Sequence, residues 1–301
     1  MSSKKIPVIL DTDIGMDIDD TWALGFLLKC PEFDVKLITT ASNDTMIKAK
    51  LIAKFLEIAG RTDIPIGIGP SENHEKGSLY NWVKDYELSK YSGTVHENGM
   101  DALCSTIMNS PDPITLIAIG PLGTVAGALK MNPNITKNAR FIGMHGSIRI
   151  GYGGAPSPHP EYNVIHDIQS CREVFHAPWK KTITPLDTCG NIVLSGDNFK
   201  RIMNCDNTIV KLIKENFEIW AKELGKTKLI TEVNKTSILF DTVAIYLGFS
   251  EELLNIEDLE IEVTEKGITK VSENGNNIRC ATSWKNVQAF KDLLVNRLVK
   301  S

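Results

Sequence analysis

The chain has 301 residues, of which 42% are hydrophobic and 23% are charged, and its formal net charge is −4. A chain of this size buries a large core without crosslinks, and its 33 basic and 37 acidic residues form no basic stripe for a nucleic-acid partner. Its six cysteines form no C-x-x-C pair, which predicts reduced thiols in a reducing, cytoplasmic compartment.

The first predicted element is a short strand, Ile6–Leu10. The segment around it, MSSKKIPVILDTD, shows neither the long apolar core nor the cleavage site that is typical of a signal peptide. Five aspartates follow it within ten residues, at positions 11, 13, 17, 19 and 20. The carboxyl ends of parallel strands face the ligand crevice, so we expect these acids to point into a site. Clustered aspartates with no nearby histidine or cysteine favour a hard cation, Ca²⁺ or Mg²⁺, over zinc. In the alternative interpretation, Asp19 and Asp20 only cap the following helix, which explains two acids and not five.

Strand-like and helical patterns then alternate through the first two thirds of the chain. The further predicted strands are Val35–Thr40, Ile64–Ile68, Ile114–Ile119, Arg140–Met144 and Thr182–Pro185. The predicted helices are Thr21–Lys29, Thr45–Ala59, Gly99–Asn109 and Leu122–Lys130. This alternation predicts an α/β fold with a mainly parallel, doubly wound sheet flanked by helices. The longest apolar run, Ile114–Leu129, is broken by glycines and a proline, so no membrane span is expected.

The last third of the chain changes character after a long loop. Residues 145–163 are rich in glycine and proline and predict a lid or a pocket wall. Helical patterns follow at Asp206–Leu224 and Asp241–Phe249, and Leu259–Ala281 resembles short antiparallel strands with a turn at Asn274–Gly275. Since there is no repeat and no clear linker, we predict a single domain over residues 1–301 with a helical and small antiparallel C-terminal part.

The aspartate cluster carries a family resemblance. The segment that contains it, VILDTDIGMDIDDTWAL, resembles the signature Asp-x-Asp-Pro-Gly-x-Asp-Asp of inosine-uridine-preferring nucleoside hydrolases, in a variant form, Asp-x-Asp-x-Gly-x-Asp-x-Asp-Asp. Two additional residues follow Gly15, and Asp19 and Asp20 are the favoured equivalents of the signature's paired acids, with Asp17 as the alternative to Asp19. Four later segments are similar and follow in family order: LITTASNDT, IAIGPLGTVAGAL, PEYNVIHD and LFDTVAIYL.

The resemblance implies a calcium-dependent enzyme of purine and pyrimidine salvage that hydrolyses the N-glycosidic bond of ribonucleosides and forms a homo-oligomer. It implies that carboxylates and one main-chain carbonyl bind Ca²⁺: Asp13, Asp20, Asp241 and the carbonyl near Gly123. It also implies four residues that hold the ribose: Asp19, Asp44, Glu161 and Asn163. Because a divalent cation lowers the pKa of its bound water, a neighbouring carboxylate can take the proton, and Asp13 is the candidate general base.

The leaving base poses a separate problem, because Phe240 stands where the best-known members carry a histidine before the aspartate of LFDTVA. Protonation by that route is excluded, so His96 is predicted as the substitute acid, with His159 as an alternative. A lone histidine is nevertheless more often structural. Trp220 is predicted to contact the base, although helical aromatics are usually core residues.

Two rival interpretations remain. Asp11-Thr12-Asp13 after a strand also resembles haloacid-dehalogenase-like phosphatases, but their motif requires threonine or valine where this chain has Gly15. The other rival is a non-catalytic relative that binds ribose or nucleoside, which the unusual residues Ile14, Asn43 and Phe240 favour.

Overall fold

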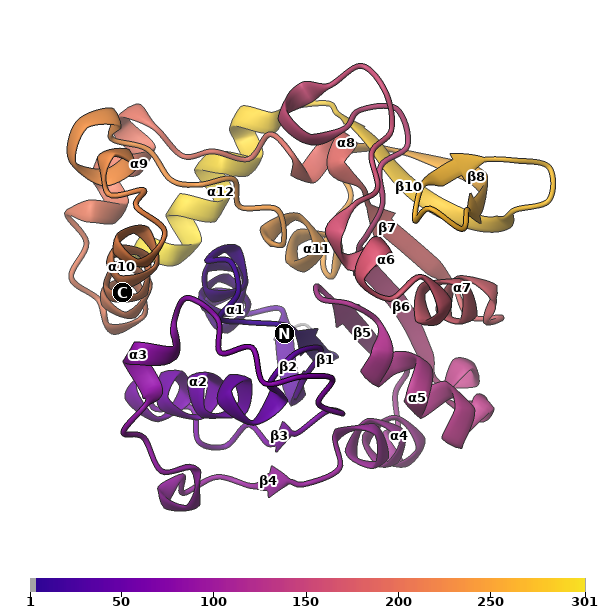
Figure 1. The fold of residues 1–301 in the computed structure, drawn as a ribbon, viewed down its shortest axis with the longest axis horizontal. Coiled ribbons are helices and arrows are strands. Elements are labelled where there is room, and N and C mark those ends of the chain that lie inside the picture. The colour runs from indigo at the N-terminus through magenta and orange to yellow at the C-terminus, as the bar shows by residue number, and fades with distance from the viewer. Residues whose placement is uncertain (1–3, 301) are drawn as a thin grey trace.

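The computed structural model describes residues 4–300 and contains a ten-stranded sheet in the order β4-β3-β2-β1-β5-β6-β7-β10-β8-β9 (Figure 1). Neighbouring strands are parallel from β4 to β10, and β8 and β9 extend the sheet in antiparallel fashion. The strands are β1 (Ile6–Thr12), β2 (Phe33–Thr40), β3 (Ile66–Gly67), β4 (Val95–His96), β5 (Ile114–Ala118), β6 (Ala139–Met144), β7 (Lys181–Thr184), β8 (Leu254–Val263), β9 (Thr269–Val271) and β10 (Asn276–Trp284). The predicted α/β class with a mainly parallel sheet is confirmed.

Helices cover both faces of this sheet (Figure 1). They are α1 (Asp19–Lys29), α2 (Thr45–Ile58), α3 (Tyr80–Val83), α4 (Gly99–Asn109), α5 (Gly123–Met131), α6 (Tyr162–His166), α7 (Ile168–His176), α8 (Leu186–Cys189), α9 (Gly196–Met203), α10 (Thr208–Glu223), α11 (Thr242–Leu247) and α12 (Val287–Val299). Helices α4, α5 and α7 pack on one face, and α1, α10, α11 and α12 lie on the other. The fold is therefore doubly wound, as the alternation predicts.

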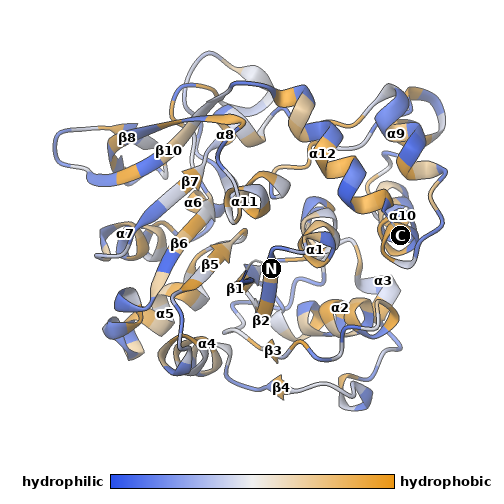
Figure 2. Ribbon diagram, turned by 180° about the vertical axis from the view of Figure 1, so that it is seen from behind, coloured by the Kyte–Doolittle hydropathy of each residue, from blue (hydrophilic) through white to orange (hydrophobic). Residues whose placement is uncertain are grey.

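The side-chain alternation of β1 explains why there are two cores. Val8 and Leu10 point to the face covered by α1 and α11, whereas Ile9 points to the face covered by α4 and α5, and all three are fully buried. Successive side chains of a strand point to opposite faces, so a strand buried on both sides must be apolar throughout. In Figure 2, β5 is largely hydrophobic, whereas β8 and β10 carry hydrophilic stretches.

The central position of β1 determines where the acidic cluster lies. β1 pairs in parallel with β2 on one side and with β5 on the other, and β5 pairs with β6. The carboxyl ends of these strands therefore meet at one edge of the sheet. The residues that follow β1, β5 and β6 all reach this edge, which is the position predicted for a ligand site.

The C-terminal part is the region where the structure adds most to the prediction. The predicted antiparallel pairing and the turn at Asn274–Gly275 are present, but β10 also joins the main sheet by pairing with β7. Helices α9 and α12 pack together over the face that carries α1. In the described part of the chain, no helix has the length and apolar character needed to cross a membrane.

Candidate active site

A cavity of about 360 Å³ opens at the carboxyl ends of β1, β5 and β6. Its walls combine acids with aromatic and aliphatic side chains, and the lining residues are Asp13, Met16, Asp17, Asp19, Asp20, Ile119, Met144, Tyr152, Glu161, Tyr162, Asn163, Leu224, Phe240 and Asp241. Six of the predicted site residues line this cavity, and so does Asp17. They come from distant parts of the sequence, since both Asp13 and Asp241 are among them.

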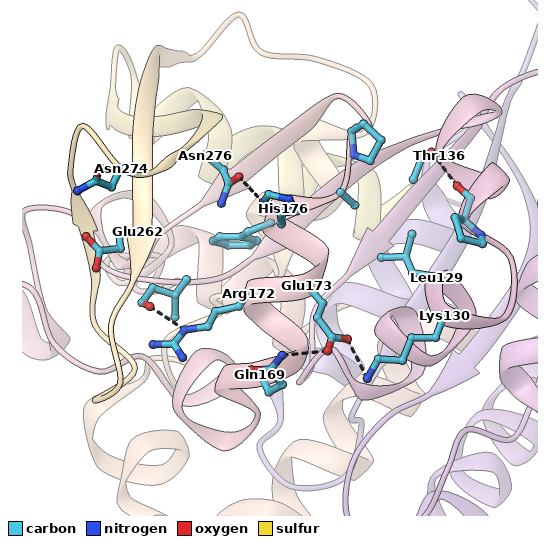
Figure 3. A pocket seen from close by; sticks show the side chains of 15 residues that line it. Leu129, Lys130, Thr136, Gln169, Arg172, Glu173, His176, Glu262, Asn274 and Asn276 are labelled. Atoms are coloured by element: carbon cyan, nitrogen blue, oxygen red, sulfur yellow. Dashed lines mark hydrogen bonds and ion pairs between the residues drawn. The ribbon is translucent and has the colours of Figure 1, made fainter.

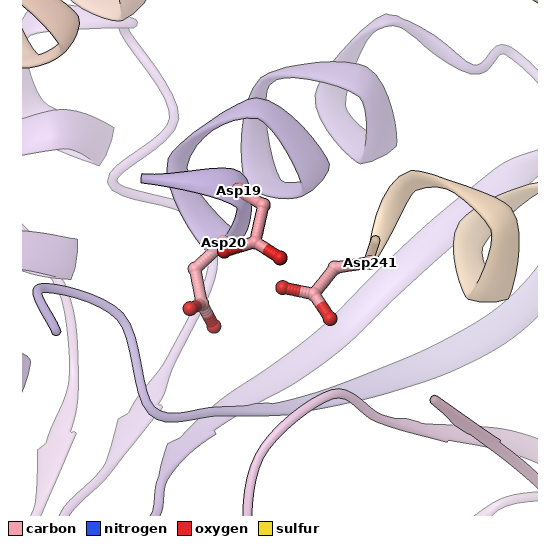
Figure 4. A group of neighbouring side chains, drawn as sticks. All are labelled: Asp19, Asp20 and Asp241. Atoms are coloured by element: carbon pink, nitrogen blue, oxygen red, sulfur yellow. The ribbon is translucent and has the colours of Figure 1, made fainter. Parts of the chain in front are cut away.

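Three carboxylates form the centre of this cavity. Asp19 and Asp20 come from the first turn of α1, and Asp241 immediately precedes α11 (Figure 4). One oxygen from each of the three lies within 4.8 Å of the others, and all three residues are buried. The N-cap of α1 is Ile18, and no side chain caps this helix. The capping interpretation of Asp19 and Asp20 is therefore wrong, and their carboxylates face the cavity.

The electrostatics of this group favour a bound cation. Burial and then the neighbouring carboxylates raise the pKa of Asp19, Asp20 and Asp241 well above the usual range. The Thr12 hydroxyl donates a hydrogen bond to Asp20, but the three acids have no lysine or arginine partner within 4.0 Å in residues 4–300. A donor set made only of oxygen atoms fits a hard divalent cation.

Glu161 and Asn163 form a second, rigid part of the cavity wall. Glu161 accepts hydrogen bonds from the main-chain N–H groups of Gly146, Asn163 and Val164, at 2.9, 2.8 and 3.3 Å. Burial raises the pKa of Glu161 to about 7, against these lowering hydrogen bonds. The Asn163 side-chain nitrogen donates to the carbonyls of Ile119 and Met144 at 3.1 and 3.0 Å. Its side-chain oxygen is consequently the atom available to a ligand hydroxyl.

The Asp13 side chain packs directly against Gly120, where a larger residue would leave it no room. A Cβ at Gly120 would lie 2.8 Å from the Asp13 Oδ1 atom and 2.9 Å from its main-chain nitrogen. Such contacts are too short for a real Cβ atom, so the glycine two residues after the end of β5 is needed for the Asp13 side chain to reach its place. The motif IAIGPLG therefore contributes to the site through the absence of a side chain.

Four predicted site residues do not line this cavity. Asp44 is the N-cap of α2, where its side chain accepts a hydrogen bond from the main-chain N–H of Ile47. His96 ends the edge strand β4 and is exposed. Gly123 is the first residue of α5. Trp220 is fully buried and lies in the wall of a neighbouring cavity, stacked on Phe217.

The aromatic wall was only partly predicted. Phe240 meets Tyr152 edge-on at 6.1 Å, and the Tyr152 hydroxyl accepts a hydrogen bond from the main-chain N–H of Tyr162. The sequence predicts a lid or a pocket wall for residues 145–163, and the structure places them in the wall, since Tyr152, Glu161, Tyr162 and Asn163 all line the cavity. No sequence signal singled out Tyr162 because the resemblance assigned roles only to its two neighbours.

The remaining histidines near the site have other partners. His145 is fully buried, and its Nε2 lies 3.1 Å from the Gly120 carbonyl oxygen. Burial lowers the pKa of His145 to about 3, so it stays neutral. His159 packs beside Tyr152 at 6.2 Å, and the His166 Nε2 lies 3.2 Å from Glu72.

A larger cavity of about 710 Å³ lies between α5, α7 and the C-terminal strands, and its charged groups are already engaged (Figure 3). Lys130 pairs with Glu173 at 3.0 Å, and the Arg172 guanidinium donates to the Val263 carbonyl at 2.9 Å. None of the predicted site residues lines it. Size alone therefore does not identify the site, whereas the convergence of acids does.

Asp11 makes an unusual contribution to stability because it is buried without full pairing. Its Oδ1 accepts a hydrogen bond from the Thr39 hydroxyl at 2.6 Å, while Oδ2 has no partner in the described part of the chain. Burial raises the pKa of Asp11 to about 7. The folded protein therefore holds a proton that the unfolded chain releases at much lower pH.

We expect the stability of the metal-free Asp11→Asn variant, compared with that of the wild type, to increase steadily as the pH rises from about 4 to about 7. The wild type has the full stability contribution of the protonated group below the unfolded pKa and loses it as the pH passes through the raised folded pKa. This loss amounts to up to about 4 kcal/mol of unfolding free energy, and asparagine does not titrate. Unfolding curves at several pH values check the effect, and a pH-independent difference between the proteins would contradict it.

Comparisons with known proteins point to one family of enzymes. The model of the inosine-uridine preferring nucleoside hydrolase family matches residues 8–299. The chain is 28% identical over 213 residues to the non-specific ribonucleoside hydrolase RihC of Klebsiella pneumoniae subsp. pneumoniae, covering 68% of this chain and 69% of the relative. It is 24% identical over 278 residues to the probable uridine nucleosidase 2 of Arabidopsis thaliana, covering 87% and 83%.

Solved structures show the same fold. A plant nucleoside hydrolase, PpNRh1, superposes with a TM-score of 0.82 at 21% identity, over 99% of this chain and 100% of that one. A purine-preferring ribonucleoside hydrolase from Gardnerella vaginalis gives a TM-score of 0.80 at 19% identity, over 97% and 98%. Since the family model spans nearly the whole sequence, the chain belongs to the inosine-uridine preferring nucleoside hydrolases, a family of enzymes that cleave the N-glycosidic bond of nucleosides.

Proposed function

We propose that the protein is a calcium-dependent hydrolase that cleaves ribonucleosides into ribose and a free base. The observation that carries this proposal is the convergence of Asp13, Asp19, Asp20, Glu161 and Asp241 on one cavity of about 360 Å³. Its oxygen donors suit both a hard cation and the hydroxyl groups of a sugar. Relatives that are named ribonucleoside hydrolases support the same substrate class.

In this proposal, Asp20 and Asp241, two of the three carboxylates that lie within 4.8 Å of one another, would hold the cation. Asp13 and the main-chain carbonyl near Gly123 would complete its oxygen ligands, although Gly123 does not line the cavity. A hard divalent cation supplies Lewis acidity, which makes a water molecule easier to deprotonate. Asp13 then takes the proton as general base. Without a cation, burial raises the pKa of Asp13, and a divalent cation beside it would lower this pKa and so favour the ionised carboxylate that acts as a base.

The remaining polar residues of the cavity hold and stabilise the sugar. Asp19, Glu161 and Asn163 bind the ribose hydroxyls, and we retain Asp44 as a more distant contributor. Glycosidic cleavage develops positive charge on the sugar ring, which carboxylates fixed in place beforehand stabilise. The three main-chain hydrogen bonds on Glu161 supply that fixed position.

The leaving group meets the aromatic wall of Tyr152, Tyr162 and Phe240. This wall offers stacking to a planar base, and Trp220 borders the adjoining cavity, which shares Phe240. His96, the acid predicted from the sequence, has an exposed side chain that does not line the cavity, so nothing in the cavity wall favours it as the donor to the leaving base. Substrates with good leaving groups should therefore be cleaved most readily.

The wider setting is also part of the proposal. The family match over residues 8–299 supports a single domain, and six free cysteines support a reducing, cytoplasmic environment. The family resemblance supports a homo-oligomer and a place in purine and pyrimidine salvage.

The decisive measurement is ribose release from p-nitrophenyl riboside and from a panel of purine and pyrimidine ribonucleosides, with Ca²⁺ and with EDTA. We expect the aryl riboside to be cleaved fastest, since its leaving group needs no acid, and EDTA to abolish all release. If no riboside is cleaved while ribose or nucleoside still binds with Ca²⁺, the protein is instead a binding relative that has lost turnover, as Phe240 would allow.

A further inference from the structure

One basic side chain is buried among the acids of the site. Lys48 lies in the first turns of α2 with only 3% of its surface exposed. It is the one lysine or arginine that is buried within residues 4–300. Its Nζ atom donates a hydrogen bond of 2.6 Å to the main-chain carbonyl of Asp13. A lysine is rarely buried unless its charge is compensated, so this position requires an explanation.

Four acidic side chains influence the charge of Lys48. Burial lowers the pKa of Lys48, and the charges of Asp13 and Asp20, followed by those of Glu75 and Asp44, oppose this shift and favour the ammonium form. No carboxylate oxygen of the described residues lies within 4.0 Å of its ammonium group, so Lys48 forms no direct ion pair. Its position near a helix N-terminus is also unfavourable for a cation. The carboxylates of the site therefore stabilise the ammonium group of Lys48, whereas the helix dipole does not.

We propose that Lys48 is a built-in counter-ion and positioning residue of the site. Its ammonium group compensates part of the carboxylate charge when no cation is present, and its hydrogen bond fixes the main chain of Asp13. The same positive charge opposes a divalent cation. Lys48 consequently lowers the affinity for the cation while it keeps Asp13 in the position needed for catalysis.

This inference rests on the proposed function, and it predicts opposite changes in cation binding and turnover. Replacing Lys48 by methionine removes the charge and the hydrogen bond but keeps most of the volume. Because a nearby like charge disappears, we expect Lys48→Met to bind Ca²⁺ at least about 10-fold more tightly. Because Asp13 loses its anchor, kcat at saturating Ca²⁺ should fall at least about 10-fold, with a smaller change in KM for the riboside.

The test uses calorimetric Ca²⁺ titration, steady-state kinetics and thermal unfolding of the full chain. The matched control is Lys50→Met, which removes a half-buried lysine two positions further along α2 and should leave all three readouts unchanged. Weaker Ca²⁺ binding together with lower kcat in Lys48→Met would show a merely structural role and overturn the inference. Unchanged binding and unchanged turnover would overturn it as well.

A second measurement needs no bound cation and therefore separates this inference from the proposed function. In EDTA, Asp13→Asn should raise the Tm more in the Lys48→Met background than in the wild type, because the missing counter-ion leaves Asp13 unbalanced. Equal shifts in the two backgrounds would refute the counter-ion role. If the wild type binds no Ca²⁺ but this coupling is observed, the proposed cofactor is wrong and the role of Lys48 stands.

Discussion

Replacing Asp13 by asparagine should lower kcat for p-nitrophenyl riboside by about 10² to 10⁴-fold at saturating Ca²⁺, the range that removal of a general base produces. Asparagine keeps the size of the side chain beside Gly120, where no spare volume exists, but it does not take up a proton from water. The measurement is kcat at Ca²⁺ concentrations high enough to fill the site, so that weaker cation binding does not contribute to the loss.

The matched control for this variant is Asp17→Asn. Asp17 lines the same cavity, but its side chain is exposed, so we expect its loss to lower kcat by much less than the about 10²-fold that a general base contributes. If Asp17→Asn is as damaging as Asp13→Asn, the general base has been assigned to the wrong aspartate. If Asp13→Asn keeps wild-type kcat while its Ca²⁺ affinity falls, Asp13 is only a cation ligand.

Much of the fold was predictable because most of its strands and helices carry a local sequence pattern of their own. Strands such as β5 (Ile114–Ala118) are apolar on both faces, and the helices between them show apolar residues at helical spacing. The two-residue strand β4 and the helix α12 (Val287–Val299) lacked such signals. β4 has too few residues for a periodicity, and α12 has apolar side chains on several sides because it packs against α1, α9 and α10.

The centre of the site was predictable for a different reason. Aspartates directly after a parallel strand have few structural explanations, and the family motifs located Glu161, Asn163 and Asp241 as partners. Lys48 and Tyr162 were missed because a single lysine or tyrosine in a helical or loop pattern normally lies at the surface. Only the tertiary structure shows that Lys48 is buried against the Asp13 carbonyl.

Asp241→Asn should weaken Ca²⁺ binding by about 100-fold or more, because it removes one of three buried carboxylates whose oxygens lie within 4.8 Å of one another. The same variant should be more stable than the wild type in EDTA, since burial and then repulsion from Asp19 and Asp20 raise the pKa of Asp241 and oppose its ionised form. Calorimetric titration and thermal unfolding with and without Ca²⁺ check both effects. Asp197→Asn removes an equal charge from a side chain that is 95% exposed and should alter neither. A variant that is destabilised in EDTA and still binds Ca²⁺ as the wild type does would mean that Asp241 serves packing, and that the cation, if one is bound, is held by other oxygens.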